Sequence, residues 1–374
     1  MGNLFRLNPL FELELGTYPE KFNPNPTILH KAKSMEYLFF ILSQANDLVV
    51  LSEKIDPYFE GYLKIKFKGK GKFLSSDKIL SQDSNLVEWG RFHSIDENGF
   101  IKDDIEKIKI SRLLNSKLSQ LKIYPSEDKL QSRKIEKNSE IQNPNFPLLF
   151  KPDLSFSGIY HKVIHKKEEL FEFQKNLQNS GVLQEYKKRI LDFSFLYEIE
   201  ENSMNFLCST EMQINEKNTY ISSKINSDKS FNNIINKYNI DFTQLNKKIK
   251  ELIQNYLSEV QIDYRGPLSI DGFIYKENNS FLIREISEIN FRYTMGRILF
   301  EVSKNFPDNK EHCLLTVSLK EYKNSKEDLL LEIEKKIKVQ SEGITKMKYR
   351  ECILLTPPFL GGKLVSSVVV YLGA

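Results

Sequence analysis

Residues 268–275, LSIDGFIY, and residues 281–292, FLIREISEINFR, are the stretch of sequence that decides the fold. Both segments are largely apolar, and the polar residues 277–279 between them predict two strands joined by a turn. Successive side chains of a strand point to opposite faces of its sheet. Three polar side chains at alternate positions of the second segment are therefore expected on one face: Glu288, Asn290 and Arg292.

Asp271 interrupts the apolar pattern of the first strand, so two acids and an amide are expected on adjacent strands. Such a cluster repels itself unless a cation fills it, and carboxylate and amide oxygens suit Mg²⁺. We predict a magnesium site formed by Asp271, Glu288 and Asn290, with Arg292 clamping a phosphate or a carboxylate. The pattern leaves two alternatives open: Glu285 in place of Asp271, although it points to the face opposite Glu288, and a surface hairpin with exposed acids.

A second feature lies upstream, at the end of the strand expected over residues 146–150. Lys151 follows this strand, and residues 155–158, Ser-Phe-Ser-Gly, form a loop of mostly small residues. A lysine beside a loop that offers backbone N–H groups can hold phosphates. His161 and His165 have no cysteine or third histidine nearby and are predicted to be solvated.

A third feature is the strand expected over residues 182–186, which runs to a turn and returns over residues 192–197. As a hinge between two lobes, this segment would offer backbone groups to an adenine edge and Asp192 to ribose hydroxyls. An ordinary amphipathic hairpin is the alternative.

The order of these features, lysine with a loop, hinge with an acid, then Asp…Glu-x-Asn-x-Arg, resembles the ATP-grasp superfamily. This is the fold of D-alanine–D-alanine ligase, biotin carboxylase and carbamoyl-phosphate synthetase, and the resemblance covers roughly residues 110–300. It implies ATP and Mg²⁺ as cofactors. The residues it places at the nucleotide are Lys117 and Lys151 at the phosphates, Ser157 and Gly158 in the phosphate loop, Glu185, Tyr186 and Lys188 at adenine, and Asp192 at ribose. The metal ligands that it implies are Asp271, Glu288 and Asn290, and its catalytic residues are Arg292 and Lys151.

Composition bounds the class of protein. A net charge of +4 over 374 residues is small for a general nucleic-acid binder. The three cysteines show no CxxC spacing, and residues 37–42, the densest apolar run, are far shorter than a membrane span of about 18 residues. We expect no signal peptide, because residues 1–6 are not a basic segment followed by a long apolar run. We expect a soluble cytoplasmic protein that binds neither nucleic acid nor membrane.

The periodicity predicts an α/β and α+β multi-lobe protein, an ATP-grasp fold preceded by an N-terminal α/β lobe. The expected N-terminal lobe covers residues 1–110. Residues 111–200 are expected to contain a linker, at 125–146, and the central lobe. The expected C-terminal lobe, with the metal site, covers residues 201–374. The expected helices cover 28–45, 167–179, 242–260, a segment from about 294, and 325–338. The remaining expected strands cover 47–51, 204–214, 352–356 and 365–371, and residues 215–240 read as an exposed stretch.

The resemblance implies an ATP-dependent ligase that joins a carboxylate to an amine, or a similar nucleophile, through an acyl phosphate, releasing ADP and phosphate. A kinase-like or carboxylase-like enzyme and an ATP-binding protein without turnover are the alternatives. The sequence identifies neither substrate and gives no oligomeric state.

Overall fold

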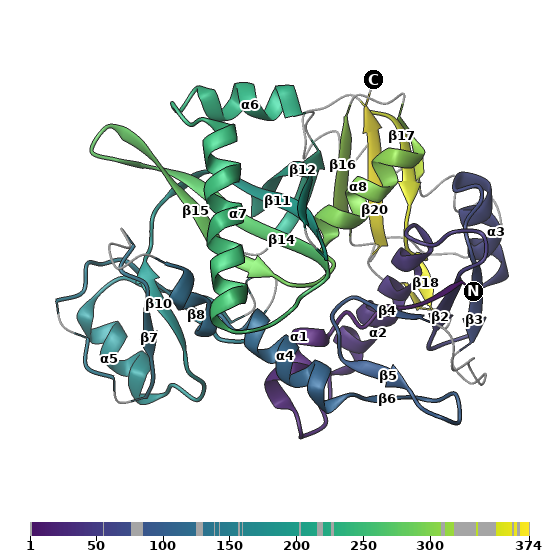
Figure 1. The fold of residues 1–374 in the computed structure, drawn as a ribbon, viewed down its shortest axis with the longest axis horizontal. Helices are drawn as coiled ribbons and strands as arrows, with labels where there is room; N and C mark the ends of the chain where they lie inside the picture. The colour runs from purple at the N-terminus through teal and green to yellow at the C-terminus, as the bar shows by residue number, and fades with distance from the viewer. Residues whose placement is uncertain are drawn as a thin grey trace.

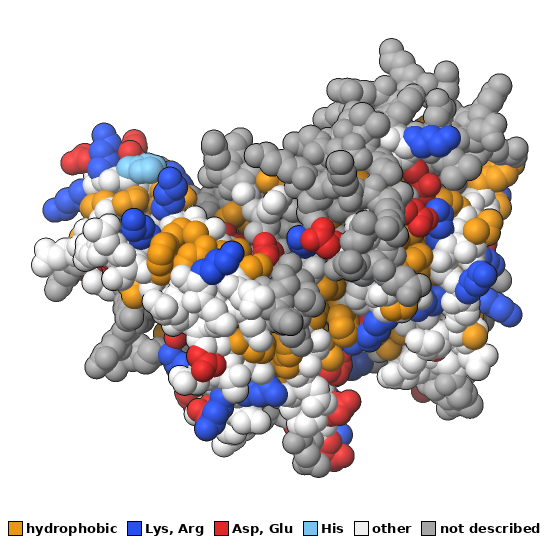
Figure 2. Space-filling view, turned by 90° about the horizontal axis from the view of Figure 1, so that it is seen from above, with side chains coloured by type: hydrophobic (Ala, Val, Ile, Leu, Met, Phe, Trp, Pro, Cys, Tyr) orange, Lys and Arg blue, Asp and Glu red, His pale blue; other side chains and the backbone are white. Residues whose placement is uncertain are grey.

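The computed structural model describes residues 2–54, 56–75, 85–124, 130–137, 139–141, 143–155, 158, 160–201, 203–214, 220–225, 228–307, 311–317, 334–335, 349–360, 363–364 and 367–373. Within these ranges, no helix is both long and apolar enough to cross a membrane. On the face seen in Figure 2, basic and acidic side chains are interspersed over the described surface.

The N-terminal lobe contains a parallel sheet in the order β3-β2-β1-β4 (Figure 1). Its strands are β1 Asn3–Arg6, β2 Leu48–Leu51, β3 Lys72–Ser75 and β4 Asn85–Glu88. The parallel α/β layer expected from residues 28–51 is therefore confirmed. The helices and short strands around it are α1 Phe11–Thr17, α2 Pro26–Met35, η1 Glu36–Phe40, α3 Pro57–Lys66, β5 His93–Ile95, β6 Ile101–Asp103, α4 Ile105–Asn115 and η2 Ser119–Ile123.

The helix predicted over residues 28–45 is shorter than expected. The α-helix α2 ends at Met35 and continues only as the 3₁₀ turn η1. The side chains from Tyr37 to Ile41 are all buried, at 2% exposure or less. A long surface helix has apolar residues along one side only, whereas this run is buried on every side. The apolar spacing of residues 28–45 therefore did not indicate one long helix.

The central lobe is a small antiparallel sheet in the order β7-β10-β8-β9, covered by helix α5. Its elements are β7 Arg133–Ile135, β8 Leu148–Pro152, β9 Lys162–Ile164, α5 Lys167–Lys175 and β10 Gly181–Glu185. Strand β7 lies inside residues 125–146, for which the sequence predicted a linker. The prediction was wrong for the three residues of this strand. Its three residues are too few to show a period.

The large sheet is antiparallel and follows the order β15-β14-β11-β12-β13-β16-β20-β17. Its strands are β11 Arg189–Glu200, β12 Ser203–Ile214, β13 Tyr220–Ile225, β14 Gly266–Glu277, β15 Ser280–Asn290, β16 His312–Val317, β17 Tyr349–Leu354 and β20 Ser367–Gly373. The hairpin predicted from residues 268–275 and 281–292 is confirmed as β14 and β15. The lobe boundary predicted after residue 200 separates β11 from β12, although these strands pair along their length.

The helices that pack on the large sheet within the described ranges include α6 Asp228–Asn236, α7 Phe242–Glu259 and α8 Met295–Asn305. Helix α7 is the one predicted at 242–260, and its predicted cap, Asp241, accepts from the N–H groups of Thr243 and Gln244 at 2.8 and 3.1 Å. The stretch at 215–240 is not merely exposed, because it contains β13 and α6. The helix predicted at 325–338 lies outside the described residues except for residues 334 and 335.

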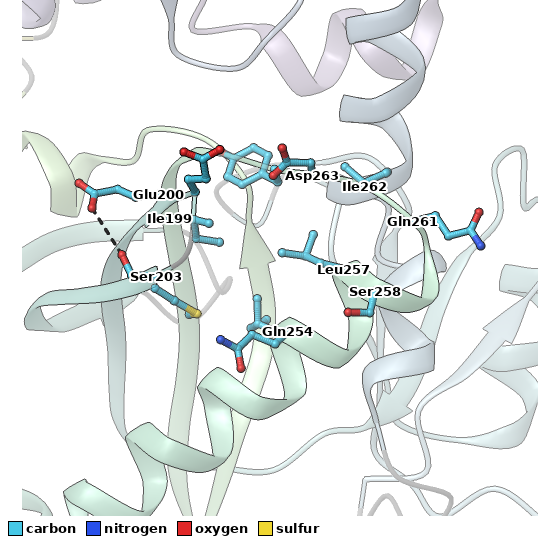
Figure 3. A pocket seen from close by; sticks show the side chains of 13 residues that line it. Ile199, Glu200, Ser203, Gln254, Leu257, Ser258, Gln261, Ile262 and Asp263 are labelled. Atoms are coloured by element: carbon cyan, nitrogen blue, oxygen red, sulfur yellow. Dashed lines mark hydrogen bonds between the residues drawn. The ribbon is translucent and has the colours of Figure 1, made fainter.

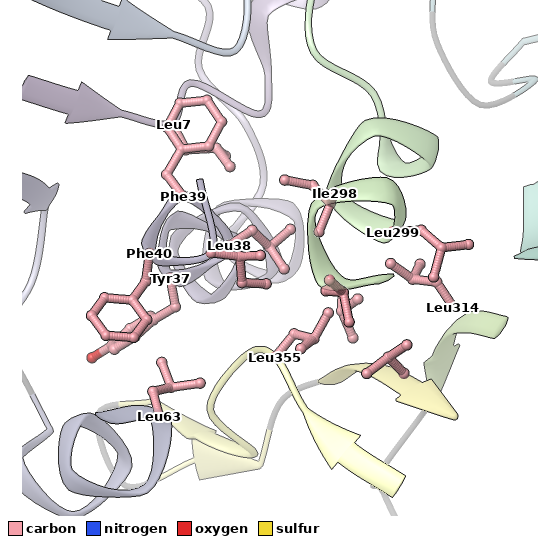
Figure 4. Close-up of a cluster of buried hydrophobic side chains, with 14 of the residues drawn as sticks. Leu7, Tyr37, Leu38, Phe39, Phe40, Leu63, Ile298, Leu299, Leu314 and Leu355 are labelled. Atoms are coloured by element: carbon pink, nitrogen blue, oxygen red, sulfur yellow. The ribbon is translucent and has the colours of Figure 1, made fainter. Parts of the chain in front are cut away.

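One hydrophobic cluster joins the N-terminal lobe to the far half of the large sheet. Tyr37 to Ile41 pack with Ile298 and Leu299 of α8, Leu314 of β16 and Leu355 (Figure 4). A second cluster fills the space between α7 and strands β11, β14 and β15. The N-terminal lobe is thus held beside the segment that follows β15, where the candidate site lies.

Candidate functional site

The three predicted metal ligands meet on β14 and β15. Asp271 lies directly opposite Glu288, and Ser269 lies opposite Asn290, in the register of the two strands. The Asn290 amide donates to Oδ2 of Asp271 at 3.2 Å. Two carboxylates and an amide therefore share one face, which is the oxygen-rich donor set that Mg²⁺ prefers. Among the described residues, no group of three or more His, Cys, Asp and Glu side chains is placed to hold a metal ion, so the carboxylates of this candidate site number two.

The electrostatics of the two carboxylates fit a cation between them. Burial, with a contribution from the charge of Glu288, raises the pKa of Asp271 to about 6. Burial alone would also raise the pKa of Glu288, but the Lys117 and Lys151 ammonium groups outweigh it and hold that pKa below its ordinary value. A cation beside Asp271 would remove the repulsion that opposes its ionisation.

Glu285, the competing ligand, lies elsewhere. Its Oε1 is 2.6 Å from Nζ of Lys248 on α7, so its carboxylate faces the helix. The register of β14 and β15 shifts between Asp271 and Phe273, with Arg284 rather than Glu285 opposite Phe273. Geometry thus favours Asp271 with Glu288 as the carboxylate pair.

Both predicted phosphate lysines are buried and reach β15. Nζ of Lys117 lies 3.1 Å from Glu288 Oε1 and donates to the Ser155 carbonyl at 2.7 Å. Nζ of Lys151 donates to the carbonyl and the hydroxyl of Ser287 at 3.2 and 3.1 Å. Burial, followed by the nearby positive charge of Arg189, lowers the pKa of Lys151 to about 7. The two hydrogen bonds of this ammonium go to neutral groups, and the negative charge of Glu288 opposes the lowering of its pKa only in part.

The predicted phosphate loop is described only in part. Ser157 lies outside the described residues. Gly158 has φ of +72°, a left-handed conformation that glycine adopts without strain. The expectation that both nearby histidines are solvated was correct for His165, which is exposed, and wrong for His161. Nδ1 of His161 is buried and has no hydrogen-bond partner among the described residues. Burial, followed by the nearby charge of Lys151, lowers the pKa of this histidine to about 3.

The segment after β10 is a connection between two sheets and not a hairpin. Strand β10 pairs with β7 and β8 in the small sheet, whereas β11 pairs with β12 and β14 in the large one. The Tyr186 N–H donates to the Pro147 carbonyl at 2.8 Å, and Lys188 is exposed. These contacts agree with the hinge interpretation and rule out the alternative of a hairpin.

The acids of the hinge have protein partners that the sequence analysis missed. Glu185 accepts from the Asn145 amide at 2.6 Å and lies 2.8 Å from Lys187. Asp192 lies 2.8 Å from Arg189, and its pKa is raised by burial in spite of that arginine. Ribose hydroxyls would share Asp192 with Arg189. Spacing three residues apart was the only sequence signal for this pair.

Arg292 differs most from its prediction. Strand β15 ends at Asn290, so the alternation that placed Arg292 on the face of Glu288 does not extend to it. The Arg292 guanidinium is buried, pairs with Glu12 of α1, and donates to the Tyr293 carbonyl at 2.9 Å. No local pattern marks Glu12, because its partner lies 280 positions away in the sequence.

No protein-family model and no curated protein matches the sequence. Among solved structures, N5-carboxyaminoimidazole synthetase from Staphylococcus aureus, complexed with ADP, aligns over 99% of this chain and 93% of that chain, with a TM-score of 0.52 and 10% identity. An ADP complex of N5-carboxyaminoimidazole ribonucleotide synthetase aligns over 100% and 92%, with a TM-score of 0.51 and 10% identity.

The L-amino acid ligase from Bacillus licheniformis aligns over 100% of this chain and 94% of that chain, with a TM-score of 0.50 and 8% identity. All three are ATP-grasp enzymes. The chain therefore has the ATP-grasp fold, and the resemblance read from the sequence is confirmed at the level of the fold.

Proposed function

We propose that this ATP-grasp chain is an ADP-forming ligase that uses ATP and Mg²⁺ to join a carboxylate to an amine or a similar nucleophile. One observation carries the proposal: two buried lysines, Lys117 and Lys151, converge on the strand that bears Glu288 and Asn290. Positive groups and a hard-oxygen metal site side by side are what phosphoryl transfer from ATP requires. The ligase and the synthetases that share the fold support the same class of reaction.

In this proposal Asp271, Glu288 and Asn290 hold Mg²⁺, and their donor set fits that ion. The bound ion would neutralise charge on the β- and γ-phosphates. Lys117 and Lys151 would hold the same phosphates, which would add to the negative charge that Glu288 already places near Lys151. Residues near the hinge would hold the nucleoside: Glu185, Tyr186 and Lys188 at adenine and Asp192 at ribose, with Ser157 and Gly158 above the phosphates.

The proposed reaction has two steps. An oxygen of the substrate carboxylate attacks the γ-phosphorus, the bond to the β-phosphate oxygen breaks, and ADP leaves. The amine then attacks the acyl carbon of the acyl phosphate, and inorganic phosphate leaves as the proton of the amine is lost. Arg292, held by Glu12, would stabilise negative charge on the transferring group or the intermediate. Positioning and electrostatics supply the catalysis, as in other phosphoryl transfers.

The proposal also places the protein in the cytoplasm. Cys208, Cys313 and Cys352 are buried as thiols, which fits a reducing compartment.

A pairwise screen of carboxylates and amines, read by phosphate release, tests the reaction. We expect ADP and phosphate only when both substrates are present. With the carboxylate alone, hydroxylamine should trap a hydroxamate, because an acyl phosphate is a good acylating agent. AMP and pyrophosphate as products would overturn the mechanism. A phosphorylated product stable to hydroxylamine would identify a kinase instead.

A further inference from the structure

A hollow of about 450 Å³ lies between the end of β11, the start of β12 and the C-terminal end of α7 (Figure 3). Its inner wall is apolar, and Ile199 of β11 and Leu257 of α7 point toward one another across it. Other apolar lining residues are buried in the second hydrophobic cluster: Met204, Ile253 and Tyr264. The volume of this hollow lies in the range of small-molecule sites.

The rim of the hollow is negatively charged. Its lining includes Glu200, Glu201 and Asp263. Arg265 lies 3.3 Å from Glu201 and 3.0 Å from Asp263, so one guanidinium serves two carboxylates. The hydrogen bonds that Glu200 accepts within the described part of the chain come from neutral groups, the Ser203 hydroxyl at 3.4 Å and the Asn205 amide at 3.1 Å.

The helix end adds to this negative potential. The C-terminus of α7 opens on the hollow through Ser258 and Gln261, and the last turn of this helix carries no basic residue. A helix C-terminus has partial negative charge that a cation stabilises. The apolar wall, the three carboxylates and the helix end are therefore complementary to a single kind of ligand, one with an apolar body and a positive charge.

We propose that this hollow is a second ligand site, separate from the nucleotide site, for a small organic cation such as an arylalkyl amine. The apolar body would lie between Ile199 and Leu257, and the ammonium group would lie on the acidic rim at Glu200, whose hydrogen bonds come from neutral groups. The lining shares no residue with the proposed nucleotide and metal ligands.

Contact with the candidate metal site gives the hollow a route to regulation. The ring of Tyr264 packs edge-on against that of Phe291, with centroids 5.0 Å apart, and Phe291 stands between Asn290 and Arg292 in the chain. The Tyr264 hydroxyl donates a hydrogen bond of 2.6 Å to the carbonyl of Pro267, which lies at the start of β14. A ligand that shifts Tyr264 would therefore move residues next to both strands of the candidate metal site.

Calorimetric titration of the full chain at pH 7.5, without nucleotide, tests the site directly. The probes are 2-phenylethylamine, its neutral analogue 2-phenylethanol and the anion 3-phenylpropionate. We expect the amine to bind about tenfold more tightly than the alcohol, because the three carboxylates act together, and the anion to bind more weakly still. Equal affinity for all three probes would overturn the proposal.

Variants locate the binding. Glu200→Gln should weaken binding of the amine about threefold, as expected for the loss of an exposed ion pair. Binding of the alcohol should not change. Leu257→Trp should fill the hollow and abolish binding of both, with circular dichroism as the check on folding. Lys151→Ala, at the nucleotide site, should bind the amine as the wild type does. Loss of amine binding in Lys151→Ala would refute the second site. Unchanged amine binding in both Glu200→Gln and Leu257→Trp would also refute it, because the amine would then bind elsewhere.

Discussion

Replacing Lys151 by methionine should stabilise the protein while destroying its nucleotide site. The pKa of Lys151 falls from 10.5 to about 7 through burial. At about 1.4 kcal/mol per unit, the buried charge costs up to about 5 kcal/mol at neutral pH. The two hydrogen bonds to Ser287 offset about 2 kcal/mol of this. Methionine fills the same space without charge, so the gain is about 3 kcal/mol, or about 4 °C in Tm for a chain of 374 residues.

The pH dependence of this gain has a definite sign. Unfolded chains hold the lysine proton up to a pKa of 10.5, whereas the folded protein releases it near 7. Between these values the wild type gains stability as pH rises, because the folded state no longer carries the buried charge. The stability difference between Lys151→Met and the wild type should therefore be largest at pH 7 and below, and shrink by about 1.4 kcal/mol per pH unit above it.

Two measurements check this prediction. Thermal unfolding without nucleotide or metal should give the higher Tm for Lys151→Met. Calorimetric titration with a non-hydrolysable ATP analogue and Mg²⁺ should show affinity weakened about 10- to 100-fold, the usual size of a lost charged hydrogen bond. Lys166→Met, at an exposed neighbouring position, should change neither quantity. A lower Tm together with unchanged analogue affinity in Lys151→Met would refute the reasoning.

Glu288→Gln should abolish Mg²⁺-dependent binding of the ATP analogue with little change in Tm, whereas Glu285→Gln should bind normally; normal binding by the Glu288 variant would exclude this metal site. Glu12→Gln should lower Tm by an amount equivalent to about 3 kcal/mol, since Arg292 is left buried without its carboxylate, and an unchanged melting curve would show that the pair contributes nothing. Arg292→Lys should reduce phosphate release at least 100-fold, because a point charge cannot replace a bidentate fork; a loss below tenfold would remove this arginine from the chemistry. Burial raises the pKa of Glu36 to about 7, so its contribution to stability is complete below pH 4.5 and is lost as pH rises to 7. Urea unfolding of Glu36→Gln should show a flatter pH profile over that window, and identical profiles would contradict the shift.

The sequence by itself determined the elements whose pattern is local. The hairpin of β14 and β15 followed from alternation and a polar turn, and it brought Asp271, Glu288 and Asn290 onto one face. Helix α7 followed from its apolar stripe and its cap at Asp241. Both patterns are complete within about 20 residues, so neighbouring side chains fix them whatever the rest of the chain does.

Only the tertiary structure decided what meets the hairpin. Lys151 bonds to Ser287 across 136 positions of sequence, and Arg292 pairs with Glu12 across 280 positions. The division of β10 and β11 between two sheets, which decides between the predicted hinge and the alternative of a hairpin, likewise depends on partners far away in sequence. Burial of charge is the physical reason. In the sequence, Lys151 cannot be distinguished from a surface lysine. The pKa of its ammonium group is lowered only when strands distant in the sequence bury it.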